Sequence, residues 1–158
     1  MNVKMSFLGL LAAAAIGTAA CGAGGYGSSQ PTDPATPATV PAASNVTVKV
    51  ADSPLGKIMV DAEGHTLYAF TKDANGTPTC VDACAKAWPA ASVNGQPVAG
   101  PGVAAPLHPV TSPTGGTMIA AGKWPLYRFA GDASPGDTNG QGSGGTWFAV
   151  AADGRLVN

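Results

Sequence analysis

Cysteines are the residues of this chain with the most distinctive chemistry. Cys80 and Cys84 lie four residues apart, and Cys21 stands alone near the N-terminus. On one helical turn, a spacing of four places two Cβ atoms about 5–6 Å apart, within reach of a disulfide after a small adjustment. The spacing is neither that of a C-x-x-C redox motif nor that of a haem attachment sequence. We predict a structural Cys80–Cys84 disulfide, with a thiol-redox pair or two metal ligands as the alternatives.

The two histidines offer little support for a metal or catalytic site. A structural zinc site at the cysteines needs two more ligands, and His65 and His108 lack the spacing of a ligand pair. His65 falls in a predicted turn and His108 precedes a proline, so we expect both to face solvent. Ser143 lacks the G-x-S-x-G setting of a nucleophile. We therefore predict no catalytic residue, no metal site and no cofactor.

A short motif of aromatic residues and one aspartate occurs twice in the sequence. The pattern L-Y-x-F-x-x-D covers residues 67–73 and recurs at 126–132, an offset of 59 residues, and each copy is followed by a Trp at the same distance. Because aromatic residues make up only 6% of the chain, chance does not explain this agreement. The physical interpretation is an internal duplication, in which two units that are each too small to bury an apolar face share one core.

The repeated residues have two interpretations. In the first, the aromatic rings fill the shared core, and the two Asp carboxylates accept backbone N–H bonds in the turns that follow the strands. In the second, the Tyr hydroxyls and the carboxylates of both copies line one groove that binds a polar or cationic ligand. The candidate ligand-binding residues are Tyr68, Phe70, Asp73, Trp88, Tyr127, Phe129, Asp132 and Trp147.

The elements that position these residues are mostly strands. We predict a mainly β fold of two pseudo-symmetric, hairpin-based repeats with one short helix over residues 81–87, in the Cys80–Cys84 region. Period two places Tyr68 and Phe70 on one strand face and Leu67 and Ala69 on the other, and the second copy repeats this. The predicted strands are 46–50, 57–60, 66–70, 117–120, 126–129 and 146–150, with a closing turn and strand at 151–157.

Composition narrows the class of protein. The 22 Gly and 14 Pro argue against a helical bundle, and a net charge of −1 argues against a nucleic-acid partner. Between the second Asp and the second Trp, residues 134–146 are Gly-rich, and we expect an exposed loop there.

The N-terminus predicts export. Residues 1–21 carry Lys4 and then an apolar run that is short for a membrane span, which is typical of a signal peptide. Thr18-Ala19-Ala20-Cys21 resembles a bacterial lipobox, which implies a lipid on Cys21 and anchoring to the cell envelope, in the periplasm or at the cell surface. Residues 22–45 are predicted to form a disordered tether. The single β domain covers residues 46–158, with repeats at about 53–98 and 112–157.

Both repeats together resemble a known family. Residues 56–73, the Cys80-x-x-x-Cys84 segment with Trp88, and residues 125–142 with Trp147 resemble the bacterial secreted-repeat lipoproteins that carry a Yx(F/W/Y)xxD motif. The resemblance implies a surface or periplasmic lipoprotein with paired repeats, and it brings no activity with it.

Function is predicted from these features together. We expect a non-enzymatic binding or interaction module that contacts the membrane through Cys21. The alternative is an extracytoplasmic redox or metal-handling protein that uses Cys80 and Cys84 with histidines or with Met59 and Met118.

Overall fold

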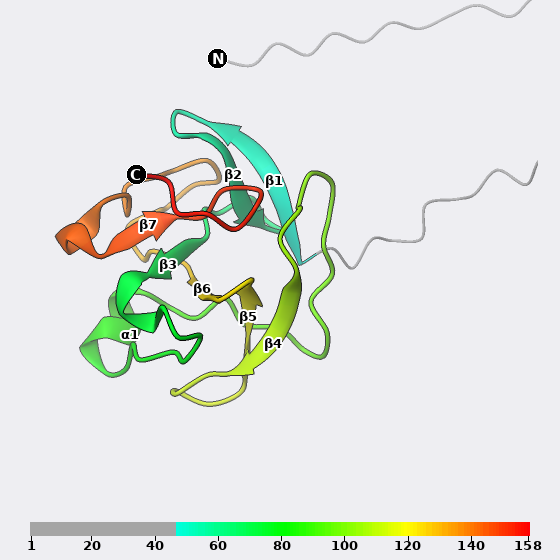
Figure 1. The fold of residues 1–158 in the computed structure, drawn as a ribbon. Helices are drawn as coiled ribbons and strands as arrows, with labels where there is room; N and C mark the ends of the chain where they lie inside the picture. The colour runs from blue at the N-terminus through cyan, green and yellow to red at the C-terminus, as the bar shows by residue number, and fades with distance from the viewer. Residues whose placement is uncertain (1–46) are drawn as a thin grey trace, which may run out of the picture. The chain divides into compact units, whose positions relative to one another are not determined.

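The computed structural model describes residues 47–158 (Figure 1). The predicted signal peptide (1–21), the lipid on Cys21 and the tether (22–45) lie outside the described residues. Between residues 47 and 158, no helix has the length and apolar character that crossing a bilayer requires.

Each repeat contributes three strands in the same order, and the second repeat contributes one further strand near its end. The strands of the first repeat are β1 (Val48–Ser53), β2 (Gly56–Asp61) and β3 (Tyr68–Phe70). Those that follow are β4 (Leu107–Thr111), β5 (Thr117–Ala121), β6 (Trp124–Tyr127) and β7 (Trp147–Ala149). The helical elements are short and comprise η1 (Thr71–Asp73), α1 (Ala83–Ala87) and η2 (Ser143–Gly145).

The described residues confirm the predicted fold class. β1 and β2 pair with each other, and the other strands form an antiparallel sheet in the order β4-β5-β6-β3-β7 (Figure 1). The one α-helix of residues 47–158 falls within the predicted range, because the chain between Cys80 and Trp88 is rich in Ala.

The pairing of β3 with β6 is the seam between the repeats. Tyr68 lies opposite Tyr127, which is its own counterpart at the offset of 59 residues. A residue that faces its own counterpart lies beside a two-fold axis, as at an isologous dimer interface. The outer partners agree, because Tyr68 also pairs with Ala149, and Tyr127 pairs with the equivalent Ala90. The two repeats are therefore related by a pseudo-two-fold axis at the seam.

The first repeat's hairpin is shorter than the sequence predicts. β2 contacts the segment before β3 through one bridge, between Val60 and Thr66, and its main partner is β1. β3 instead pairs with β6 and β7, both distant in sequence. The second repeat keeps its predicted hairpin, with β5 paired to β6 around Gly122 and Lys123.

Two clusters of buried side chains lie on opposite faces of the seam. Leu67, Ala69 and Leu126 belong to an aliphatic cluster, whereas Tyr68 and Tyr127 belong to an aromatic one. The predicted alternation of faces is confirmed. The predicted single interior is two interiors, because loops cover both faces of the central strands and each face then selects its own side chains.

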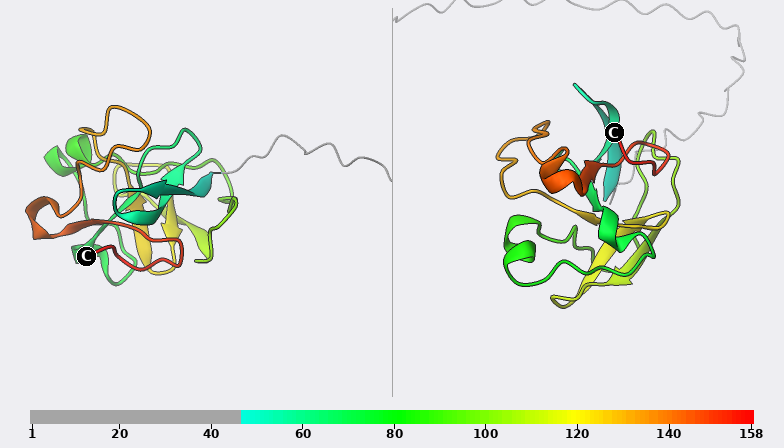
Figure 2. Two further views of the ribbon diagram at one scale, coloured as in Figure 1. Left: turned by 90° about the horizontal axis from the view of Figure 1, so that it is seen from above. Right: turned by 60° about the vertical axis from the view of Figure 1, so that its left-hand side comes forward.

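The Gly-rich loop is largely exposed, as the sequence predicts, but Gly140 within it is buried. A Cβ on Gly140 would lie 2.9 Å from ring atoms of both Tyr68 and Trp88, so only glycine fits there. The amide of Gln141 donates to the Val157 carbonyl at 2.6 Å and accepts from the Ala149 N–H at 2.8 Å. The loop and α1 lie at the same end of the domain in both views of Figure 2.

Candidate functional site

The repeated tyrosines and aspartates bond across the seam rather than within a repeat. The hydroxyl of Tyr68 donates to Asp132 Oδ2 at 2.7 Å, and the hydroxyl of Tyr127 donates to Asp73 Oδ2 at 2.6 Å. Each repeat therefore supplies the donor of one bond and the acceptor of the other. Charge-assisted bonds of this length are among the strong hydrogen bonds of proteins.

Each carboxylate also holds the loop that follows it. Asp73 Oδ1 accepts from the N–H and the hydroxyl of Thr79 at 3.0 and 2.6 Å, and Asp132 Oδ1 accepts from the N–H of Asn139 at 2.9 Å. Both aspartates are buried. A buried carboxylate needs such partners to offset its lost hydration. The prediction that these aspartates tie loops is confirmed, and each one also joins its loop to the other repeat.

The aromatic rings follow the same symmetry. Trp88 and its counterpart Trp147 stack in parallel, with ring centroids 3.9 Å apart. Phe70 stacks on Trp147 at 4.3 Å, and its counterpart Phe129 packs on Trp88 at 4.5 Å. The four rings form one continuous stack across the pseudo-two-fold axis. Aromatic contacts of this kind add about 0.5–1.5 kcal/mol each to the stability that burial itself provides.

Burial changes the acid–base behaviour of the two tyrosines. Desolvation, and then the hydrogen bond and negative charge of Asp132, raise the pKa of Tyr68 well above its ordinary value. Desolvation and Asp73 raise the pKa of Tyr127 in the same way. Both hydroxyls are therefore protonated donors at neutral pH.

All eight candidate ligand-binding residues meet in this one cluster. Six of them are buried, while Phe70 and Phe129 are partly buried at its edge. The tyrosine hydroxyls and the carboxylates are occupied by one another, which gives these residues a structural role. A role in ligand binding stays a prediction.

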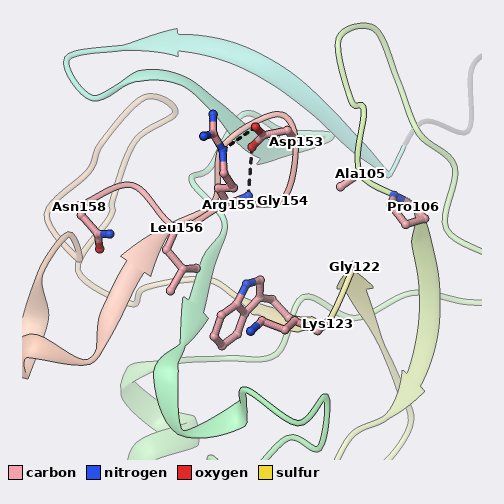
Figure 3. Close-up of a pocket in the computed structure, with 10 residues that line it drawn as sticks. Ala105, Pro106, Gly122, Lys123, Asp153, Gly154, Arg155, Leu156 and Asn158 are labelled. Carbon is pink, nitrogen blue, oxygen red and sulfur yellow. Dashed lines mark hydrogen bonds and ion pairs between the residues drawn. The ribbon is translucent and has the colours of Figure 1, made fainter.

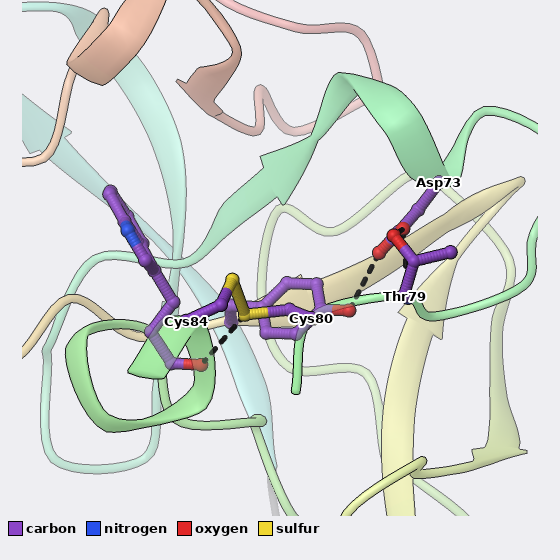
Figure 4. Close-up of a disulfide and its surroundings, with 6 residues drawn as sticks. Asp73, Thr79, Cys80 and Cys84 are labelled. Carbon is purple, nitrogen blue, oxygen red and sulfur yellow. Dashed lines mark hydrogen bonds between the residues drawn. A yellow bond between two sulfur atoms is a disulfide. The ribbon is translucent and has the colours of Figure 1, made fainter. Parts of the chain in front are cut away.

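The cysteines are joined as the sequence predicts. Cys80 and Cys84 form a disulfide with Cα atoms 5.3 Å apart, and Thr79, beside Cys80, is bonded to Asp73 (Figure 4). Asn139, the counterpart of Cys80, is bonded to Asp132 with no disulfide beside it. Met59 and Met118, which the redox or metal alternative invoked, are fully buried in different clusters. Thiol-redox activity stays a prediction.

The sequence interpretation missed a surface hollow at the β5–β6 turn. It has a volume of about 470 Å³ and lies between the turn and the C-terminal segment (Figure 3). Lys123 Nζ lies 4.7 Å from the centroid of the Trp124 ring, and Arg155 Nε lies 2.7 Å from Asp153 Oδ2. In the sequence, the feature that could have predicted this hollow was the Lys123-Trp124 pair in a predicted turn. A second hollow of about 490 Å³ lies beside α1, and none of the eight candidates lines either one.

A charged cluster at the corresponding turn of the first repeat was also missed. Arg128 Nε lies 2.7 Å from Asp61 Oδ2, and Arg128 Nη2 lies 3.2 Å from Glu63 Oε2. His65 Nδ1 lies 3.5 Å from the same Asp61 oxygen and is buried, whereas the His65 side chain as a whole is 27% exposed, so the expectation of a solvent-facing His65 holds only in part. His108 is exposed as expected. The alternation of Asp61, Glu63 and His65 along the sequence could have predicted this charged cluster.

A family model described as a secreted repeat of unknown function matches residues 49–92 and 109–151. The chain belongs to this family of secreted repeats. The two matches together cover more than half of the chain, and each contains one Tyr, one Asp and one Trp of the seam. Comparison with curated proteins gave no significant match, and neither did comparison with solved structures. The geometry explains why the repeat occurs in a pair, since each copy completes the hydrogen bonds of the other.

Replacing either seam tyrosine with phenylalanine tests this exchange. We expect Tyr68→Phe and Tyr127→Phe each to lower the free energy of unfolding by about 1–3 kcal/mol, because a buried carboxylate oxygen loses its donor. Asp132→Ala should lower the free energy of unfolding by more, since it leaves both the Tyr68 hydroxyl and the Asn139 N–H without their acceptor. Urea unfolding measures the changes. Ser134→Ala, which removes an exposed hydroxyl, is the control, and an equal stability of wild type and both Phe variants would contradict the exchange.

The raised tyrosine pKa values predict instability at alkaline pH. A group whose pKa is higher in the folded state stabilises the protein fully below its unfolded pKa, here about 10, and that stability is lost as the pH rises toward the folded value. We expect the free energy of unfolding to fall above about pH 10. Phenolate absorbance in a Tyr26→Phe background should report ionisation only as the domain unfolds. Ionisation of these tyrosines near pH 10 in protein that is still folded would contradict the prediction.

Proposed function

We propose that this secreted repeat protein is a non-enzymatic binding module anchored to the cell envelope. The sequence supports the anchor through the signal peptide and the lipobox-like Thr18-Ala19-Ala20-Cys21, followed by the tether at 22–45. The seam supports the non-enzymatic role, because its tyrosines and aspartates are bonded to one another and act as scaffold.

The hollow at the β5–β6 turn is the single observation that carries the binding role. Its volume lies in the range of small-molecule sites, and Leu156 and the edge of Trp124 supply an apolar wall. Lys123 and Arg155 are exposed cations beside that wall, and Asp153, which also lines the hollow, pairs with Arg155 and leaves Lys123 as the cation without a carboxylate partner within the described residues. An apolar wall with cations beside it suits an acidic ligand that has one apolar face, such as an acidic saccharide.

Lipid attachment is tested at Cys21. We expect the wild-type protein to carry a lipid mass and to sediment with membranes, and Cys21→Ser to lose both properties, because the lipobox-like cysteine is the attachment point. Mass spectrometry and membrane fractionation measure this. Ser28→Ala, in the tether, is the control. A Cys21→Ser protein that still sediments with membranes would exclude this anchor.

Ligand binding is tested at the two cations of the hollow. We expect acidic oligosaccharides to raise the melting temperature of the wild-type protein and neutral oligosaccharides to leave it unchanged. Lys123→Ala and Arg155→Ala should weaken binding, measured by calorimetry, because each removes a cation from the site. Lys57→Ala removes an exposed cation that is likewise paired to an Asp, at 2.9 Å, outside the hollow, and is the matched control. Equal binding by all four proteins would exclude the hollow.

A further inference from the structure

The turn between β2 and β3 gathers three side chains that can ligate a metal ion. Asp61, Glu63 and His65 each offer one ligand atom, and these atoms lie within 4.8 Å of one another. The set is one imidazole and two carboxylates, the donors that zinc accepts in proteins. This cluster is separate from the hollow, which the second repeat forms with the C-terminal segment.

The same turn holds an unusual group of polar atoms. Within residues 47–158, the buried side-chain nitrogen and oxygen atoms that lack a hydrogen-bond partner are Asp61 Oδ2, His65 Nδ1 and Arg128 Nε. All three belong to this cluster, and Asp61 is only 3% exposed. These three atoms face one another: Arg128 Nε forms an ion pair with Asp61 Oδ2 at 2.7 Å, and His65 Nδ1 lies 3.5 Å from the same oxygen. His65 Nδ1 is therefore the buried atom that still needs a close partner, which a bound ion can supply.

The backbone of the turn fixes the direction of Asp61. Its Oδ1 accepts from the N–H groups of Gly64 and His65 at 2.8 and 2.9 Å. These bonds are possible because Gly64 adopts a φ of 100°, which favours glycine. With Oδ1 committed to the turn, Oδ2 points at His65 Nδ1 and at the guanidinium of Arg128, which are 3.5 and 2.7 Å away. One ligand position is therefore preorganised.

We propose that Asp61, Glu63 and His65 form a binding site for a divalent transition-metal ion of the zinc class. Imidazole favours zinc, copper and nickel over calcium and magnesium, which prefer oxygen ligands. Bonds of about 2.0–2.2 Å place two ligands of one ion roughly 3–4 Å apart. The Glu63 side chain is 61% exposed and can make the remaining approach. Zinc sites with three protein ligands leave the fourth position to water.

Arg128 takes the place of the ion when the metal is absent. Its guanidinium contacts both carboxylates and neutralises part of their charge. The side chain is 42% exposed, so it can leave without disturbing the core. A metal ion and Arg128 compete for the same oxygens, because both are cations that need the same lone pairs. Removing Arg128 must then strengthen metal binding.

One site is expected in each chain. At the offset of 59 residues, the counterparts of the three ligands are Ala120, Gly122 and Trp124, none of which ligates metals. The pseudo-symmetry of the core therefore does not extend to the three metal ligands.

The test is calorimetric titration of chelator-treated protein, purified after export, with Zn²⁺, and the Co²⁺ absorption spectrum as a second readout. We expect one ion per chain. His65→Ala should weaken zinc binding by at least about tenfold, because loss of even an outer-shell partner of a ligand commonly costs about 10–100-fold in metal affinity. Glu63→Gln, at an exposed position, should weaken it without affecting folding. Arg128→Gln should tighten it, whereas Arg128→Lys, which keeps a competing cation, should not.

The controls separate this site from adventitious binding. His108→Ala removes the other histidine, which is exposed on β4, and should leave zinc affinity unchanged. The proposal is overturned if neither the wild type nor Arg128→Gln binds one Zn²⁺ or Co²⁺ ion. It is also overturned if His108→Ala weakens binding as much as His65→Ala does. Circular dichroism of each variant shows that the domain is folded, and the Lys123→Ala test of the hollow is independent of these results.

Discussion

The exchange of hydrogen bonds between Tyr68 and Asp132, and between Tyr127 and Asp73, is the constraint on which the rest of this structure depends. Each carboxylate is buried and carries a loop on its second oxygen. A single repeat would leave its tyrosine without an acceptor and its aspartate without a donor, at a cost that one small unit cannot offset. The repeat is therefore half of a structural unit, and the domain is the smallest complete one.

The aromatic stack packs the two repeats together across the same pseudo-two-fold axis. Trp88 and Trp147 face each other across the pseudo-two-fold axis, and Phe70 and Phe129 close the two ends. Gly140 brings its backbone against these rings, where no side chain would fit. The symmetric interior thus constrains the sequence of both copies at the same positions, which explains why the repeated motif consists of aromatic residues and one aspartate.

The surface chemistry lies where the copies differ. The β2–β3 turn of the first repeat carries Asp61, Glu63 and His65, whereas the equivalent turn of the second repeat carries Lys123 and Trp124. The Cys80–Cys84 disulfide is likewise present in one copy only. A duplicated scaffold that is held together by internal bonds leaves its turns free to diverge, because these turns contribute little to the seam.

The sequence alone determined the duplication, the mainly β class, the faces of the seam strands and the cysteine pair, since each of these follows from local spacing and period. Only the tertiary structure decided that Tyr68 bonds to Asp132 rather than to its own Asp73, that β3 lies between β6 and β7, and that His65 Nδ1 faces Asp61. Partner choice across a distance of 64 residues depends on how the two repeats are placed together, and no local pattern records that placement.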